Sequence, residues 1–288
     1  MILSTCRASS VVVRFVCADG ITILGGVLGA IQSQIWTANG LVMGQLTDHA
    51  RMPYESMSRS GMHQGFGQFC PVALASEVLT QRWTLLILRE LMAGSSRFND
   101  IRRGVPRISA TLLKSRLETL ERADIVERRQ AKGRDTQEYF LTDAGNDLRS
   151  VLGQIGEWGQ RWARDMRSQD LDPGWLVWNI HRRLNTAEMP SGRTVIEIEF
   201  SDAPRNHRNF WLVNSHGDVE VCLKPPGYSV DLTVRTTVRV LAEVWRGIRP
   251  IRQELRAGTM HLEGRTALKR AFPKWLLLSV YAPIRRMR

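Results

Sequence analysis

The sequence predicts an α+β protein in which a mainly helical part precedes a sheet with helices of its own. Three observations support this prediction. From about residue 71 to 167, apolar residues recur at the three- and four-residue spacing of amphipathic helices, interrupted by one pair of alternating segments. From about 193 to 236, short runs alternate apolar with polar residues between turn residues, as strands do. Helical spacing returns after residue 237, and 288 residues suffice for two hydrophobic cores.

The chain is strongly basic, with a formal net charge of +12 and a pI of about 10.4. Such a charge makes polyanions plausible partners. The part after Ser168 contributes 19 Lys and Arg against 12 Asp and Glu, which is +7 of the +12. Total charge therefore does not locate a binding surface. The prediction of nucleic-acid binding depends on where the charges lie relative to a helix.

The cysteines and the hydropathy pattern indicate the compartment. The four cysteines are far apart and lack C-x-x-C spacing, so neither a disulfide framework nor a zinc site is predicted. No apolar run approaches the roughly 20 residues that span a bilayer. We therefore expect a reducing, cytoplasmic location and no membrane partner.

The segment 97–141 predicts a short helix, a turn, a second helix and a basic hairpin. Pro106 discourages continuation of the first helix, and Ser109 can cap the second. The second helix then presents one apolar stripe to a core, formed by Leu113, Leu117 and Leu120. A helix-turn-helix with a cationic wing is the simplest interpretation of this pattern.

Polar and basic residues of this segment are candidates for contact with nucleic acid. Eleven Lys and Arg stand against five Asp and Glu between residues 97 and 134. A solvated helix face is the alternative for the helical positions, and Arg116 is expected to flank the core or to pair with a carboxylate. The candidate DNA-binding residues are Ser109, Thr111, Lys114 and Ser115 on the second helix, Arg97 with Arg102, Arg103 and Arg107 as backbone contacts, and Lys132 and Arg134 at the wing tip.

A long amphipathic helix is predicted after Leu141, with Thr142 as its cap. Its apolar stripe is long for a helix that packs only on a small domain. An exposed stripe of this kind usually finds a partner. We therefore expect this helix and the first one to form a homodimer interface. The stripe consists of Leu148, Val151, Leu152, Ile155, Trp158 and Trp162.

Residues 70–167 resemble the HxlR-type winged helix-turn-helix transcriptional regulators, which are relatives of the MarR type. The resemblance implies a dimer that binds double-stranded DNA, with the helix Ala110–Arg122 in the major groove and the wing along the backbone. Asp124 stands where the family usually has a glycine, and aspartate enters the left-handed region more readily than most residues. The matching segments are Cys70-Pro71, RWTLLILRELMAGSSRFNDIRR, ISATLLKSRLETLERADIVERR and EYFLTDAGNDL.

The resemblance also implies a possible redox role for Cys70, because some family members sense oxidants through a cysteine at this place. Sensing requires a thiolate. The alternative is a partly buried, inert thiol.

Residues 175–288 resemble the type-two sterol carrier proteins, through the helix–meander–helix order and the segments VDLTVRTT and GTMHLEG. That resemblance implies a lipid-sized apolar tunnel between sheet and helices, and hence an apolar small-molecule or lipid effector. The tryptophans here are expected in the core, some of them lining such a cavity. Four arginines are predicted on or near one side of a late helical segment, as a solvated face or as ligands of an anionic head group or of DNA: Arg246, Arg249, Arg252 and Arg256.

The predicted organisation is an extension over 1–69, a winged helix-turn-helix domain over 70–168, a linker over 169–174 and a sterol-carrier-like domain over 175–288. An alternative for the extension is that translation starts at one of its methionines, Met52, Met57 or Met62. The predicted function is a DNA-binding transcriptional regulator. The alternative is a lipid-binding or carrier protein whose helical half binds proteins. No catalytic constellation, cofactor motif or metal-ligand spacing appears, so an enzyme is not expected.

Overall fold

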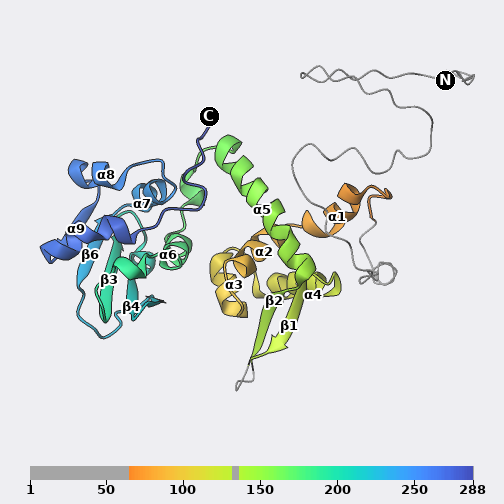
Figure 1. Ribbon diagram of the computed structural model, residues 1–288, viewed down its shortest axis with the longest axis horizontal. Helices are drawn as coiled ribbons and strands as arrows, with labels where there is room; N and C mark the ends of the chain where they lie inside the picture. The colour runs from red at the N-terminus through yellow and green to blue at the C-terminus, as the bar shows by residue number, and fades with distance from the viewer. Residues whose placement is uncertain (1–64, 132–135, 288) are drawn as a thin grey trace, which may run out of the picture. The chain divides into compact units, whose positions relative to one another are not determined.

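The computed structural model describes residues 65–131 and 136–287 (Figure 1). The predictions for Lys132 and Arg134, and those for the extension before residue 65, lie outside the described residues. Within the described residues, no helix is both long enough and apolar enough to cross a bilayer.

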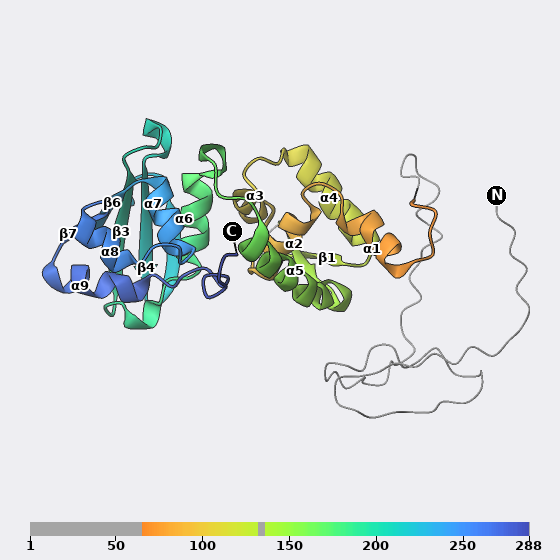
Figure 2. The same ribbon diagram turned by 90° about the horizontal axis from the view of Figure 1, so that it is seen from above.

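The first part of the described chain is helical with one hairpin. Its core is formed by buried aliphatic side chains of α2, α3 and α4, including Ile87, Ile101 and Leu113. The longest helix, α5, lies alongside α2 (Figures 1 and 2). The elements are α1 (Pro71–Leu79), α2 (Thr84–Met92), α3 (Phe98–Gly104), α4 (Ala110–Arg122), β1 (Val126–Gln130), β2 (Gln137–Leu141) and α5 (Asp143–Trp162).

Helix α4 begins and ends as its sequence predicts. The Ser109 hydroxyl accepts a hydrogen bond from the backbone N–H of Leu112 at 3.2 Å, which is an N-cap. Its predicted leucine stripe is confirmed, because all three leucines are at most 1% exposed. The chain leaves the helix through Asp124, whose φ of 55° lies in the left-handed region. Glycine, the residue usual at this place in the family, favours that region.

The sequence of α2 predicts that Trp83, Leu86, Leu88 and Leu91 point mostly inward, and for Leu86 this prediction is wrong. Leu86 is 39% exposed, whereas Ile87 is completely buried. The helix starts at Thr84, after Trp83 has adopted a left-handed φ of 80°. The buried face therefore runs through Thr84, Ile87, Leu88 and Leu91, at the i, i+3, i+4 and i+7 positions of one helix face.

The hairpin of β1 and β2 is tied to both flanking helices. The backbone N–H of Tyr139 donates to the carbonyl of Ser96 at 2.8 Å, just before α3. The Thr142 hydroxyl caps α5 by accepting from the N–H of Gly145 at 3.2 Å, and it donates to the carbonyl of Asp124 at 2.6 Å. These bonds hold α3, the hairpin and α5 in one arrangement around α4.

The second part contains a five-stranded sheet in the order β5-β4-β3-β6-β7, in which only the β3–β6 pair is parallel. The β4–β5 connection has positive φ at His216 and Gly217, which is a type I′ hairpin turn. The elements are η2 (Ser168–Asp170), α6 (Pro173–His181), η3 (Thr186–Glu188), β3 (Arg193–Phe200), η4 (Arg205–His207), β4 (Asn209–Ser215), β5 (Asp218–Cys222), β6 (Leu232–Thr236), α7 (Val238–Trp245), α8 (Ile251–Ala257), β7 (His261–Gly264) and α9 (Thr266–Trp275).

The two faces of this sheet differ in chemistry. Ile196, Ile198 and Phe200 of β3 point into a core that α6, α7 and α9 complete. Between them, Glu197 and Glu199 point to the opposite face, where β6 and β7 add polar side chains. This alternation was predicted from the sequence and is confirmed.

The four late arginines do not form one face, so that prediction is wrong. Arg246 packs against α5 and donates to Gln160 Oε1 at 2.6 Å. Arg249 is held by Glu243 and Glu254 through ion pairs. Arg249, Arg252 and Arg256 are exposed, but only Arg252 and Arg256 lie on α8. The prediction treats the segment as one continuous helix, whereas α7 ends at Trp245 and α8 begins at Ile251. The turn between these two helices separates the side chains.

Candidate nucleic-acid interface

The outer face of α4 carries the polar residues expected to meet nucleic acid. Thr111, Lys114 and Ser115 are exposed, on the side opposite the buried leucines. The side chain of Lys114 is 69% exposed, and its Nζ lies 4.0 Å from Glu118 Oε1. A surface pair of this length contributes little, so the ammonium remains able to bind an anion. Ser109 is exposed as well, although its hydroxyl already caps the helix.

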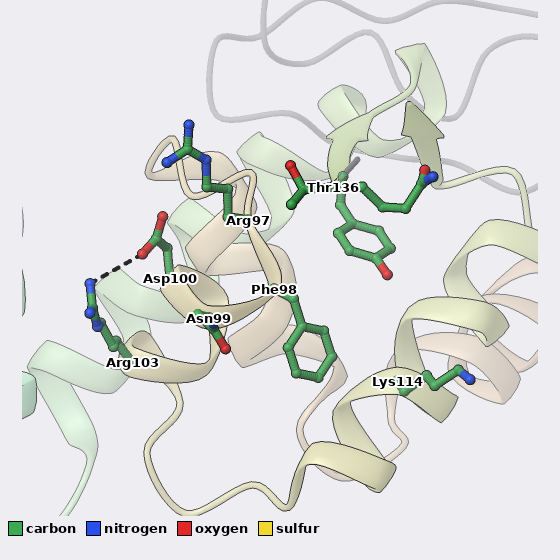
Figure 3. A pocket seen from close by; sticks show the side chains of 9 residues that line it. Arg97, Phe98, Asn99, Asp100, Arg103, Lys114 and Thr136 are labelled. Atoms are coloured by element: carbon green, nitrogen blue, oxygen red, sulfur yellow. Dashed lines mark hydrogen bonds and ion pairs between the residues drawn. The ribbon is translucent and has the colours of Figure 1, made fainter. Parts of the chain in front are cut away.

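A hollow of about 550 Å³ lies between α3, α4 and the start of β2 (Figure 3). Arg97, Arg103 and Lys114 place three cationic groups around it, and Phe98 and Tyr139 supply apolar surface. Its other lining residues are polar: Asn99, Asp100, Thr136 and Gln137.

The cations of the hollow are only loosely neutralised. Arg97 Nε lies 3.3 Å from Glu138 Oε1. Arg103 Nη1 lies 3.3 Å from Asp100 Oδ1, as Figure 3 shows. Both arginine side chains are more than half exposed. Partial burial raises the pKa of Tyr139, so its hydroxyl stays protonated and can donate a hydrogen bond.

The other predicted basic residues have different roles. Arg102 is exposed on α3. Arg107 donates to the carbonyl of Gln169, away from α4. Arg116 was expected to flank the core or to pair with a carboxylate. Its guanidinium instead donates to Gln81 Oε1 at 2.7 Å and to the carbonyl of Arg82 at 3.2 Å, so it holds the turn between α1 and α2.

Sequence reasoning did not single out Asn99 and Gln137, which line the same hollow as Arg97 and Lys114. Their polar character carries no signal by itself. The Tyr139–Ser96 backbone bond brings the start of β2 beside α3, and only this long-range pairing places them together.

Cys70 is a free thiol on the surface, at the N-cap position of α1. A further apolar surface is exposed on α5 and α1. The stripe residues Val151, Ile155, Trp158 and Trp162 of α5 are each at least 41% exposed, and Val72 of α1 is 73% exposed. By contrast, Leu148 and Leu152 pack against the core of α2, α3 and α4.

Comparison with known proteins gives the family of this architecture. The HxlR-like helix-turn-helix family model matches residues 78–167. The HTH-type transcriptional regulator YvaP of Bacillus subtilis (strain 168), which is described as uncharacterized, is 34% identical over 111 residues, covering 38% of this chain and 95% of YvaP. The chain belongs to the HxlR-like helix-turn-helix family.

A second relative, known also from a solved structure, matches the same part of the chain. The HTH-type transcriptional regulator YodB of the same organism is 35% identical over 95 residues, covering 32% of this chain and 85% of YodB. The solved structure of the reduced form of YodB is 31% identical, with a TM-score of 0.31 over 35% of this chain and 100% of that one. These relatives are transcriptional regulators and not enzymes, in agreement with the prediction that this chain is not an enzyme.

Proposed function

We propose that this HxlR-like protein binds operator DNA as a homodimer, with α4 in the major groove. The observation that carries the proposal is the division of α4 into two faces. Leu113, Leu117 and Leu120 anchor it to the core, while Thr111, Lys114 and Ser115 face solvent near its N-terminus. The N-terminal residues of a recognition helix are those that meet base edges. Lysine in the major groove prefers guanine acceptors.

The cationic hollow supports a backbone contact beside α4. Arg97 and Arg103 are exposed there, and Tyr139 lines the same hollow. We assign phosphate contacts to Arg97 and to the wing-tip residues Lys132 and Arg134. Contacts of this kind set the position of a protein on DNA without reading its sequence.

The exposed stripe of α5 supports the dimer. Val151, Ile155, Trp158 and Trp162 repeat at i, i+4, i+7 and i+11, which is one face of a helix. Together with the exposed apolar side chains of α1, this stripe forms a self-complementary surface of the kind that a twofold axis requires. The proposed dimer reads two half-sites about one helical turn apart.

The proposal divides the chain into a winged helix-turn-helix domain over 70–168, a linker over 169–174 and a sterol-carrier-like domain over 175–288. One-sided packing of α6, α7 and α9 on a five-stranded sheet supports the last assignment. In this scheme an apolar effector changes DNA affinity by binding better to one dimer geometry than to the other.

The direct test is fluorescence anisotropy with the protein's own upstream intergenic DNA and an excess of nonspecific competitor. We expect a specific complex, and Lys114→Ala should weaken it about tenfold or more, because one good base contact contributes roughly 1–3 kcal/mol. Lys224→Ala, an exposed lysine after β5, is the matched control and should bind as the wild type does. Weak binding that the competitor abolishes would favour the carrier alternative instead.

The wing contacts have a separate signature. Lys132→Ala with Arg134→Ala should weaken binding to all DNA sequences alike. The slope of log Kd against log salt should fall by about two, roughly one for each lost phosphate contact. An unchanged slope would refute the wing assignment and leave the α4 assignment intact.

A further inference from the structure

A cavity of about 650 Å³ lies where α2, α5, α6, α7 and the segment 279–281 meet. Its size is that of a small-molecule site. None of its lining residues lies on a strand, so it differs in place from the tunnel between sheet and helices that the sterol-carrier resemblance implies. Neither the family nor the proposed DNA contacts account for it.

The walls of the cavity are mostly apolar. Trp175 of α6 and Trp245 of α7 meet edge to face, with ring centroids 6.0 Å apart, beside Leu176 and Val238. Trp245 is 8% exposed, and its buried Nε1 has no hydrogen-bond partner among the described residues. A buried indole N–H usually finds an acceptor, and this one is unpaired in a residue that lines the cavity.

Two of the four arginines that line the cavity have no carboxylate partner within ion-pair distance among the described residues. Arg183 donates through Nε to the carbonyl of Leu278 at 2.7 Å. Arg246 donates to the neutral amide oxygen of Gln160 at 2.6 Å. By contrast, Arg89 and Arg182 both pair with Glu90.

The environment of Arg246 disfavours its charge. Burial, followed by the nearby Arg286, lowers the pKa of this guanidinium, and Asp165 and Glu243 oppose the shift only in part. The acidic groups in the lining do not neutralise it. Asp170 is paired with Arg164, and Asp172 caps α6 by accepting from the N–H of Trp175. An anion placed beside Arg246 would therefore relieve an unfavourable buried charge.

We propose that this cavity binds an amphiphile with one anionic head group. Its head lies between Arg183 and Arg246, and its apolar body lies against Trp175 and Trp245. Such a ligand touches α2 and α5 as well as α6 and α7, and so bridges the helical part and the sheet part of the chain. The consequence for DNA rests on the proposed function, whereas the binding itself does not.

The test uses isothermal titration calorimetry on the full chain, with dodecanoate below its micelle concentration as the probe and 1-dodecanol as its uncharged counterpart. We expect dodecanoate to bind at least about tenfold more tightly than the alcohol. Arg246→Gln should remove that preference. Arg252→Gln, an exposed arginine of α8 outside the cavity, should keep it.

A blocking variant separates the cavity from the exposed apolar surface. A Cβ added at Gly159 meets nothing within 4 Å, and the same is true at Gly153 on the same helix. Of these two glycines, Gly159 lines the cavity and Gly153 does not. Gly159→Leu should abolish dodecanoate binding, and Gly153→Leu should leave it unchanged.

Equal affinities for acid and alcohol would refute the anionic site, and wild-type binding by Gly159→Leu would refute the cavity. A separate DNA-binding titration with dodecanoate present distinguishes binding in the cavity from an effect of that binding on DNA affinity. Calorimetric binding without any effect on DNA affinity keeps the site and removes its regulatory role. Loss of DNA binding in every condition would instead reject the regulator proposal alone.

Discussion

Arg182, at the C-cap of α6, donates through Nη1 to Oε2 of Glu90 in α2 at 2.8 Å. The Glu90 side chain is 1% exposed and also accepts from Arg89 at 2.9 Å. Arg182 further donates to the hydroxyl of Ser95 at 2.6 Å. A buried carboxylate of the helix-turn-helix part is therefore neutralised by an arginine that belongs to the sheet part.

The Arg182→Met variant should lower the free energy of unfolding by about 3 kcal/mol. Removing one partner of a buried ion pair leaves a charge that is not compensated, and the remaining Arg89 limits the loss. Urea denaturation measures it, with Arg252→Met as the exposed control. A loss no larger than that of the control would show that the pair does not hold the two parts together.

Gly104→Ala should destabilise the protein by about 1–3 kcal/mol through overpacking. A Cβ at Gly104 would lie 1.9 Å from Glu90 Cδ. The carboxylate has no room to withdraw, because Arg89 and Arg182 both hold it. Gly153→Ala has open space around it and should be neutral or stabilising, since alanine favours the helix. Thermal denaturation of both variants tests whether the backbone at Gly104 packs this closely against Glu90.

Ile155→Glu should convert the proposed dimer to a monomer. The residue is 46% exposed at the middle of the α5 stripe, so a carboxylate there would be buried on dimerisation without a partner. Sedimentation equilibrium gives the oligomeric state. The control is Gln154→Glu, at the exposed neighbouring position outside the apolar stripe. A wild-type protein that sediments as a monomer would contradict the interface outright.

Stability should fall between about pH 6.5 and 4 because of His181. Burial, followed by the neighbouring Arg182, lowers the pKa of this imidazole from 6.5 to about 4. Glu90 and Arg103 also face it, and its Nδ1 is buried without a partner among the described residues. In this pH window the unfolded chain binds a proton that the native state does not, so the free energy of unfolding decreases as the pH falls.

The loss should amount to about 1–3 kcal/mol for a shift of this size. His181→Gln should flatten the dependence, while His207→Gln, an exposed histidine, should keep it. Urea denaturation at several pH values checks this, and an identical slope in His181→Gln would contradict the assignment.

Cys70→Ser tests the redox hypothesis. The thiol is free and exposed, so an oxidant can reach it. If it is a sensor, diamide should change the DNA affinity of the wild type and leave that of Cys70→Ser unchanged. Equal DNA affinity with and without diamide would identify it as an inert thiol.

Local sequence pattern was sufficient for α4, for the strands and for the caps at Ser109 and Thr142. In these places the chain's own periodicity and short-range hydrogen bonds decide the conformation, and both are visible within a few residues. The positive φ of Asp124 was expected from the resemblance, because the family usually has a glycine there. Sequence pattern failed at Leu86, because the left-handed Trp83 shifts the phase of α2 and nothing in the local composition indicates it.

Tertiary structure alone decided which charges are paired, buried or open. Glu90 and Arg182 are 92 residues apart. Asn99 and Gln137 line one hollow only because β2 bonds back to the segment before α3. The late arginines illustrate the same limit, since the turn between α7 and α8 separates Arg246, which lines a cavity, from the exposed Arg252 and Arg256. The sequence by itself determined the elements and the helix-turn-helix pattern, because these depend on neighbours along the chain. The cavity and the ion pair between the two cores depend on neighbours in space.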